Sequence, residues 1–399
     1  MAGAPGGGES GGAPADFDST HFLVHTDMGA KHAKALLAKL ETMLGLISKY
    51  WGRPPHGVIE LYVVDDLRNW PPGSLNPIGA AKIAEQGGIT LTETLTLGGQ
   101  KVDARAVVYA VAHDGVAQHE AVHAYCGQSF GTAGPLWYAE GMAEMGNYWQ
   151  PNDSSVHISP VVLNYVQHSE PQSLDEIIRI NNAQNLVGDS WQNYAWRWAL
   201  CHLLANNTNY SARFRPLGLG FLTEQRVSFE DTYGAMAREI EFEYLFFVRH
   251  IEDGYRVDLC SWDWKKRFKP LIDVAASVRV EARHGWQPTG VEVKAGRRYE
   301  YTASGAWQIE KDGPELTADG DDRGAGRLVA AIFDDFSLGE PFPLGVSGVL
   351  TAPASGQLHV RCDDAWGKLA DNKGAVTLKL RVAKPDAAAT SRSGASTAE

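Results

Sequence analysis

The sequence has no long apolar segment and no recognisable targeting segment. No run reaches 18 consecutive apolar residues, so we predict no transmembrane helix. The N-terminus lacks the charged and apolar regions of a signal peptide. Met1 is followed by a stretch rich in Gly, Ala, Pro and Ser, which is typical of a mature chain whose leader was removed. We therefore expect an extracellular or periplasmic protein.

Cysteine is scarce, with four residues in 399, at Cys126, Cys201, Cys260 and Cys362. Their spacing fits no CxxC motif and no zinc knuckle. In a chain of this size the pattern favours four free, mostly buried thiols over disulfides. Cysteine usage therefore does not decide the compartment.

Positive charge is also in short supply. The 36 Lys and Arg face 48 Asp and Glu, which gives a net charge of −12 and argues against nucleic acid and anionic lipid as partners. The apolar fraction of 44% and the twelve Trp are typical of a well-packed globular protein. A length of 399 residues allows two or three domains.

The most informative motif is His-Glu-x-x-His at residues 119–123. On a helix, His119 and His123 project from the same face, and two imidazoles at that spacing can share one tetrahedral Zn²⁺. Glu120 lies beside them, where a carboxylate takes a proton from a water molecule as a general base. The motif alone is short enough to arise by chance, so a third ligand is required.

Glu140 is the candidate for that ligand. It lies in the segment 137–144 (Trp-Tyr-Ala-Glu-Gly-Met-Ala-Glu), and the interval from His123 suits a helix, a turn and a second helix running back past the first. Glu144 follows one helical turn later, where it can accept the second ring N–H of a ligating His. The alternative is two unrelated helices with surface His and acidic residues.

The pattern along the chain predicts four segments. Residues 1–16 and 385–399 are of low complexity and predicted to be disordered. Residues 17–270 begin with strands at 20–26, 58–64, 88–97 and 104–112 and a helix at 31–51 with Asp27 as its N-cap, and continue almost entirely helical. In the predicted helical segment 227–253, the core candidates are Phe242, Leu245, Phe246 and Ile251. Residues 276–384 show short alternating strands separated by Gly, Pro and Asp clusters, which favours an all-β sandwich.

With these motifs in place, residues 20–256 resemble the gluzincin metallopeptidases, most closely a bacterial peptidase-MA-like family. The resemblance rests on residues 22–27, the His-Glu-x-x-His segment, residues 137–144 and residues 229–234 (Phe-Glu-Asp-Thr-Tyr-Gly). It implies an α+β chain with a thermolysin-like zincin core, made of a small mixed sheet and a mainly helical lobe. It also implies His119, His123 and Glu140 as zinc ligands, Glu120 as base and Glu144 as the supporting acid.

The resulting prediction is a zinc metallopeptidase acting on a peptide or glycoprotein substrate. The tetrahedral oxyanion needs a donor besides the metal. Tyr194, in a predicted helix over residues 191–205, is the first candidate, with Tyr138 and His157 as alternatives. The surrounding aromatic residues, at 191–198, are expected to pack in the core. The rival prediction is a carbohydrate- or surface-binding protein with a structural or vestigial zinc site.

Residues 276–383 resemble a second family, the PA-I-type galactose-binding lectin domains. Matching pieces lie at residues 291–296, 303–307, 326–332, 355–359 and 363–374. The resemblance implies Ca²⁺ bound by Asp364, Asp371 and Asn372, and a carbohydrate ligand. The loop at residues 319–325 lacks the sugar-contacting His and Gln of that family, a departure that argues against galactose. The alternative is a purely structural sandwich with solvated Asp and Asn loops.

Overall fold

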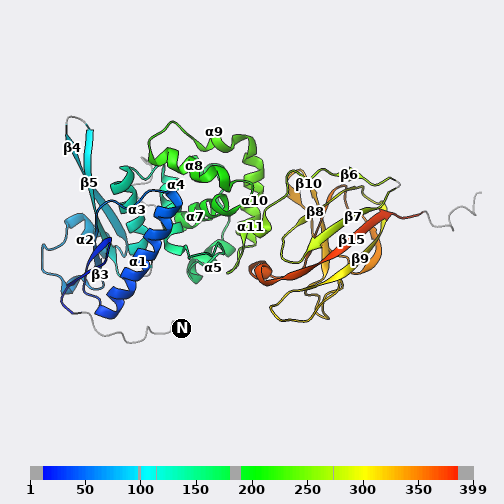
Figure 1. The fold of residues 1–399 in the computed structure, drawn as a ribbon, viewed down its shortest axis with the longest axis horizontal. Helices are drawn as coiled ribbons and strands as arrows, with labels where there is room; N and C mark the ends of the chain where they lie inside the picture. Colours follow the sequence, from blue (N-terminus) through cyan, green and yellow to red (C-terminus); the bar gives the residue numbers. More distant parts are fainter. Residues whose placement is uncertain (1–11, 98–99, 114, 180–189, 273, 385–399) are drawn as a thin grey trace, which may run out of the picture. The chain divides into compact units, whose positions relative to one another are not determined.

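The structure is a computed structural model that describes residues 12–97, 100–113, 115–179, 190–272 and 274–384. We predicted residues 1–16 and 385–399 to be disordered. Of these, residues 1–11 and 385–399 lie outside the described residues. The chain is a mixed α+β protein with several sheets, and it divides into two compact units, Met1–His250 and Ile251–Glu399 (Figure 1). Among the described residues, no helix is long and apolar enough to cross a bilayer.

The first unit is built on a five-stranded mixed sheet in the order β1-β2-β3-β5-β4. The strands are β1 (Ala15–Asp18), β2 (Phe22–Thr26), β3 (Ile59–Val64), β4 (Gly88–Leu97) and β5 (Gln100–Val111). β2, β3 and β5 run parallel, whereas β1 and β4 are antiparallel to their neighbours. β1 begins inside the segment that we predicted to be disordered, because its backbone pairs with β2. β4 is an edge strand, which matters for the site below.

Helices cover both faces of this sheet. α3 (Val116–Phe130) packs against β5, and α1 (Ala30–Trp51) packs against β2 and against α3. α2 (Pro77–Ala84) packs on the opposite face of β5, over Trp70 and Tyr109. We did not predict α2, although Asn76 as N-cap and Pro77 at the first helical position are its sequence signal.

The predicted N-cap of α1 is wrong. The helix is capped by Gly29, and the side chain of Asp27 is instead buried between strands. Its two carboxylate oxygens accept hydrogen bonds from the backbone N–H groups of Asp65 and Asp66, at 2.7 and 2.9 Å. Asp27 therefore satisfies the backbone beyond the end of β3 rather than the first turn of a helix.

The described part of the rest of the first unit is mainly helical, as predicted. It contains α4 (Leu136–Tyr148), α5 (Pro160–His168), α6 (Leu174–Arg179), α7 (Trp191–Asn206), α8 (Ser211–Leu222), α9 (Phe229–Tyr233) and α10 (Ala237–Arg249). α5 and α8 were not predicted. α4 packs between α3 and α7, so that the helix of the first motif, the helix of the second motif and the aromatic helix lie side by side (Figure 1).

The buried face of α10 differs from the predicted one. Phe242, Leu245 and Phe246 are half-buried, while the buried residues include Glu243 and Phe247. The carboxylate of Glu243 accepts hydrogen bonds of 2.6 Å from Asn207 and from Tyr210. A buried charge is tolerated because these donors replace its water, and hydrophobicity alone cannot locate a face that carries it.

The second unit is an all-β sandwich of a six-stranded and a four-stranded sheet. The first sheet has the order β11-β10-β14-β8-β6 with β12 beside β10, and the second has β13-β9-β15-β7. The strands are β6 (Lys269–Pro270), β7 (Ala276–Glu281), β8 (Gln287–Val293), β9 (Arg298–Gln308), β10 (Leu328–Asp334), β11 (Ser337–Leu338), β12 (Phe342–Pro343), β13 (Ser347–Thr351), β14 (Gly356–Cys362) and β15 (Lys373–Val382). Inward-facing residues of both sheets form one core.

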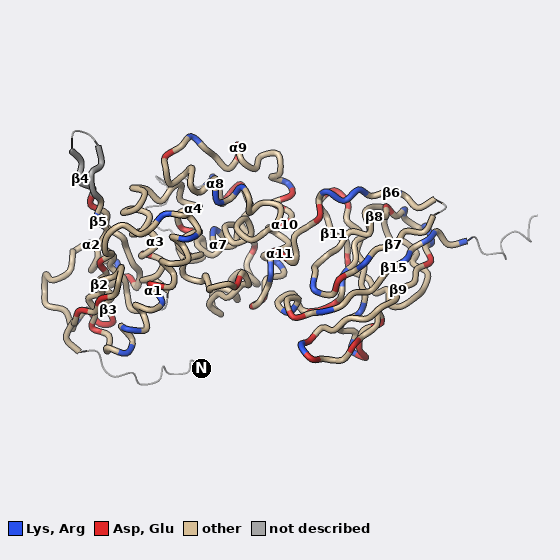
Figure 2. The backbone as a smooth tube through the Cα atoms, in the orientation of Figure 1, with Lys and Arg blue, Asp and Glu red and all other residues tan. Residues whose placement is uncertain are grey.

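The segment before β6 belongs to this unit because it packs on the sandwich. The ring of Trp262 lies 4.9 Å from that of Phe333 and 4.4 Å from that of His359. Figure 2 shows acidic and basic residues interspersed along both units, with one basic run leading into β6.

All four cysteines are free, as the sequence predicts. Cys126, Cys201 and Cys362 are buried, and Cys260 is half-buried. Burial raises the pKa of each of the three buried thiols, so these side chains behave as small apolar residues.

Candidate metal centre

Two neighbouring helices bring the motif residues together. α3 follows directly after β5, and a turn at residues 131–135 leads into α4, which packs against α3. His119 and His123 project from one face of α3, because they are separated by one helical turn. Glu140, from the second turn of α4, faces both imidazoles.

The distances between these side chains fit a shared metal ion. Nε2 of His119 lies 3.2 Å from Nε2 of His123, and Oε2 of Glu140 lies 3.1 Å and 3.4 Å from those two nitrogens. Ligands about 2.0–2.1 Å from a tetrahedral metal are separated from one another by roughly 3.3 Å. The three atoms therefore occupy three corners of such a tetrahedron, and within the described ranges they form a group able to hold a metal ion.

Glu144 orients the first of these ligands. Its Oε1 lies 2.9 Å from Nδ1 of His119, so the carboxylate accepts the Nδ1–H and orients the ring with Nε2 toward His123 and Glu140. The imidazole of His119 is buried, and burial alone would lower its pKa. Hydrogen bonds to Glu140 and Glu144 outweigh that effect and hold the pKa of His119 well above its usual value.

Glu140 is the anionic member of the group. Burial would raise the pKa of its carboxyl, but the facing imidazoles of His123 and His119 hold that pKa well below its usual range. Glu140 therefore stays ionised, which is the form that a metal ligand requires.

The side chain of Glu120 lies against the edge strand β4. The hydroxyl of Thr90 lies 2.8 Å from Oε2 of Glu120 and 2.8 Å from the backbone carbonyl oxygen of the same residue. A Cβ atom at Gly88 would lie 2.7 Å from Cγ of Glu120, so only glycine leaves room for this side chain. We predicted neither Thr90 nor Gly88, and a Thr in a Thr-rich strand carries no sequence signal.

An open cleft of about 480 Å³ runs over the group. It is lined by His119, Glu120, His123, Glu140 and Tyr194, together with residues of β4 and of the turn before α4. The ring of Tyr194 stacks on His119 at a centroid distance of 5.5 Å. α7, which carries Tyr194, packs tightly against α4 at Gly141. A Cβ atom at Gly141 would lie 2.4 Å from Sγ of Cys201, so glycine allows this close contact between the two helices.

The expectation that residues 191–198 pack in the core holds for Trp196 and Trp198, which are buried. It does not hold for Trp191, whose side chain is exposed, or for Tyr194, which lines the cleft.

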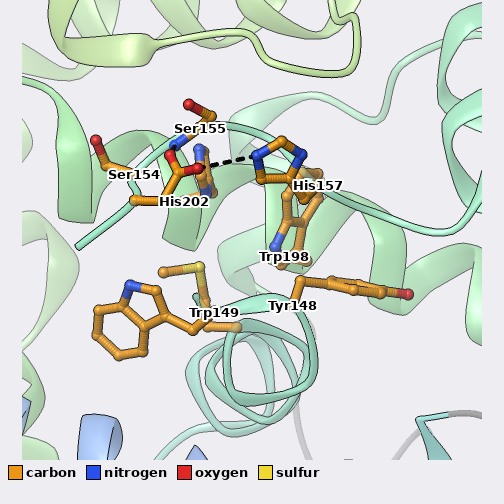
Figure 3. A pocket seen from close by; sticks show the side chains of 9 residues that line it. Tyr148, Trp149, Ser154, Ser155, His157, Trp198 and His202 are labelled. Atoms are coloured by element: carbon orange, nitrogen blue, oxygen red, sulfur yellow. Dashed lines mark hydrogen bonds and ion pairs between the residues drawn. The ribbon is translucent and has the colours of Figure 1, made fainter. Parts of the chain in front are cut away.

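The other two candidate oxyanion donors lie elsewhere. Tyr138 is fully buried, and its hydroxyl accepts a 2.9 Å hydrogen bond from the indole N–H of Trp51. His157 pairs with Asp153 at 3.1 Å and lines a separate pocket with Trp198 (Figure 3). That pocket has a volume of about 10 Å³, enough for one water molecule but not for a substrate.

The residues predicted to bind Ca²⁺ lie in the second unit, around the short helix η3 (Trp366–Asp371). The side chains of Asp364 and Asn372 contact each other; Asn372 is buried and Asp364 is half-buried. Within the described residues, Oδ2 of Asp364 and Oδ1 of Asn372 are buried and have no hydrogen-bond partner. Two orphaned acceptor oxygens suit a hard cation. Asp371, the third predicted ligand, is exposed at the end of η3.

Fold and site together define an α+β protein of two units, with a His-His-Glu group on two packed helices of the first unit and a β-sandwich as the second. No protein-family model matches the chain, and no curated protein matches it. Among solved structures, a domain titled "EclA N-terminal domain; PllA-like lectin" is similar, with 25% identity over 28% of this chain and 98% of that chain. Its TM-score of 0.24 does not establish a shared fold.

Proposed function

We propose that the first unit is a zinc-dependent peptidase. The observation that carries the proposal is the spacing of His119 Nε2, His123 Nε2 and Glu140 Oε2, which matches three corners of a zinc tetrahedron. Two imidazoles and one carboxylate with an open fourth position are typical of catalytic rather than structural zinc sites.

Each residue then has a separate task. The chemistry that Zn²⁺ supplies when bound is polarisation of the scissile carbonyl and acidification of water. Glu120 takes a proton from the attacking water at its carboxylate and passes it to the nitrogen of the leaving amine, which balances the hydrolysis. Glu144 keeps His119 in the tautomer that presents Nε2. Tyr194, whose ring stacks on His119 and lines the cleft, is the proposed donor for an oxyanion.

The edge strand supports a peptide as the substrate. β4 lines the cleft through Gly88, Ile89, Thr90 and Thr92, and it ends the order of the sheet. An extended peptide can add to such an edge through backbone hydrogen bonds, which would hold its scissile bond over the metal group. An open cleft of this volume accommodates several residues of a chain.

The test is chelator-controlled cleavage of a broad peptide library by the full chain. We expect cleavage with one zinc per chain, loss with a chelator and recovery on adding zinc. Glu120→Gln removes the base but touches none of the three ligand atoms, so it should retain zinc and lose hydrolysis by roughly 10²-fold to 10⁴-fold. A variant with wild-type turnover would refute the role of Glu120. Glycan binding without any cleavage would favour the carbohydrate-binding alternative.

We propose further that the second unit binds Ca²⁺ through Asp364 and Asn372. The two buried, unpartnered oxygens support this, since each loses its water without gaining a donor. A sandwich of this kind could direct the peptidase to glycosylated substrates. Deleting the whole second unit, residues 251–399, would then slow cleavage of a glycoprotein and leave cleavage of a small peptide unchanged.

A further inference from the structure

The side chain of Thr90, on the edge strand β4, is hydrogen-bonded to the carboxylate of Glu120. If Glu120 is the general base, this hydrogen bond orients it. We propose that Thr90 is a positioning residue that holds Oε2 of Glu120 and so presents Oε1 to the cleft. The proposal rests on the proposed peptidase function. Within the described chain Oε1 has no hydrogen-bond partner, whereas Oε2 lies 2.8 Å from the Thr90 hydroxyl.

The backbone around Thr90 is itself well fixed. β4 pairs antiparallel with β5, and Thr90 lies opposite Val108, whose side chain is fully buried. A β-branched side chain on a strand has few rotamers, so the direction of the hydroxyl follows from the register of the strand. The sheet therefore fixes the position of the Glu120 carboxylate, in addition to the helix that carries Glu120.

Gly88 acts on the other side of the same carboxylate. A Cβ at this position would lie 2.7 Å from Cγ and 3.2 Å from Oε1 of Glu120. The two residues alternate with Ile89 along β4, so they share one face of the strand. Thr90 thus attracts Glu120, and Gly88 leaves the space into which it fits.

The hydroxyl of Thr90 also lies 2.8 Å from the backbone carbonyl oxygen of residue 120, so Thr90 contacts Glu120 at both its side chain and its backbone. A methyl group in place of the hydroxyl could donate to neither oxygen.

The experiment compares Thr90→Val, which removes the hydroxyl and keeps the branched shape, with Thr90→Ser, which keeps the hydroxyl. For Thr90→Val we expect a kcat lowered roughly 10-fold to 100-fold, because misplacing a catalytic group by about 1 Å can lower the rate about 100-fold. KM should change by less than about twofold, since in this proposal the Thr90 hydroxyl contacts Glu120 and not the substrate. Thr90→Ser should recover most of kcat.

Zinc stoichiometry and melting temperature should stay at wild-type values in both variants, because Thr90 contacts none of the three ligand atoms. Thr42→Val is the matched control. It removes a hydroxyl that is exposed on α1 and bonded to the backbone of Ala38, and it should leave kcat unchanged. Gly88→Ala is the second variant, and we expect a lowered kcat with zinc retained.

A crystal structure of Thr90→Val gives a readout that does not depend on activity. We expect the Glu120 carboxylate to leave the position of the wild-type protein. An unmoved carboxylate, or wild-type kcat in Thr90→Val, overturns the positioning role while the peptidase proposal stands. If the wild type cleaves no peptide but the carboxylate moves in the variant, the positioning role stands and the peptidase proposal falls.

Discussion

Removing the carboxylate of Glu144 should weaken zinc binding although Glu144 is not among the three proposed ligands. Its Oε1 accepts the Nδ1–H of His119 at 2.9 Å, and the side chain of His119 is only 9% exposed. In Glu144→Ala, this N–H loses its acceptor in a place that water reaches poorly. The imidazole also loses the contact that selects its tautomer and directs Nε2 toward the metal.

Two independent estimates of the effect agree. An unmet buried hydrogen-bonding group costs about 1–3 kcal/mol. Loss of a supporting partner of a metal-bound His typically lowers affinity about 10-fold to 100-fold, which corresponds to about 1.4–2.7 kcal/mol. We therefore expect the Kd for zinc to rise by one to two orders of magnitude in Glu144→Ala. Glu144→Gln keeps an acceptor oxygen without the charge and should show a smaller rise.

The measurement is competition for zinc against a chromophoric chelator at fixed pH. His123→Ala serves as the reference for loss of a ligand and should bind less than one zinc per chain. Glu144→Ala should lie between this variant and the wild type. An unchanged Kd in Glu144→Ala would refute the role of Glu144, and a fully zinc-loaded His123→Ala would remove His123 from the site.

Two further predictions concern pH and calcium. The carboxylate partners of His119 raise its pKa in the metal-free protein. Below that pKa, His119 holds a proton that zinc must displace, so the Kd for zinc should rise as the pH falls. A Kd that does not depend on pH would contradict this prediction. Adding Ca²⁺ should raise the melting temperature of the second unit, by the equivalent of about 2.7 kcal/mol at a hundred times the Kd. Asn372→Leu lacks the orphaned Oδ1 and should abolish the rise, and a rise that persists would exclude Asn372 as a ligand.

The metal group could be predicted because local rules determine most of it. The helical repeat places His119 and His123 on one face wherever the helix forms, and a short turn lets a second helix return past the first. The same repeat puts Glu140 and Glu144 on one face of α4. The structure then brings all four side chains within hydrogen-bonding distance of a neighbour in the group. The β-strands after residue 270 could also be predicted from the sequence, because the alternation of inward and outward side chains along a strand is a local pattern.

The choice among the three candidate oxyanion donors was not local. Tyr194, Tyr138 and His157 all lie near the motifs in sequence or on helices of similar composition. Packing separates them, because α7 places Tyr194 against His119, while Tyr138 packs in the core and His157 pairs with Asp153. The buried face of α10 depends in the same way on Asn207 and Tyr210, which lie on other elements.

The sequence by itself determined the composition of the candidate metal group, because its residue types and their helical spacing are encoded within residues 119–144. Only the tertiary structure decided how Glu120 is held. Thr90 and Gly88 lie about thirty residues before it, on a strand whose register with β5 aims the hydroxyl at the carboxylate. Such a contact depends on how α3 packs against the edge strand β4. The hydrophobic periodicity of β4 and of α3 does not predict that packing.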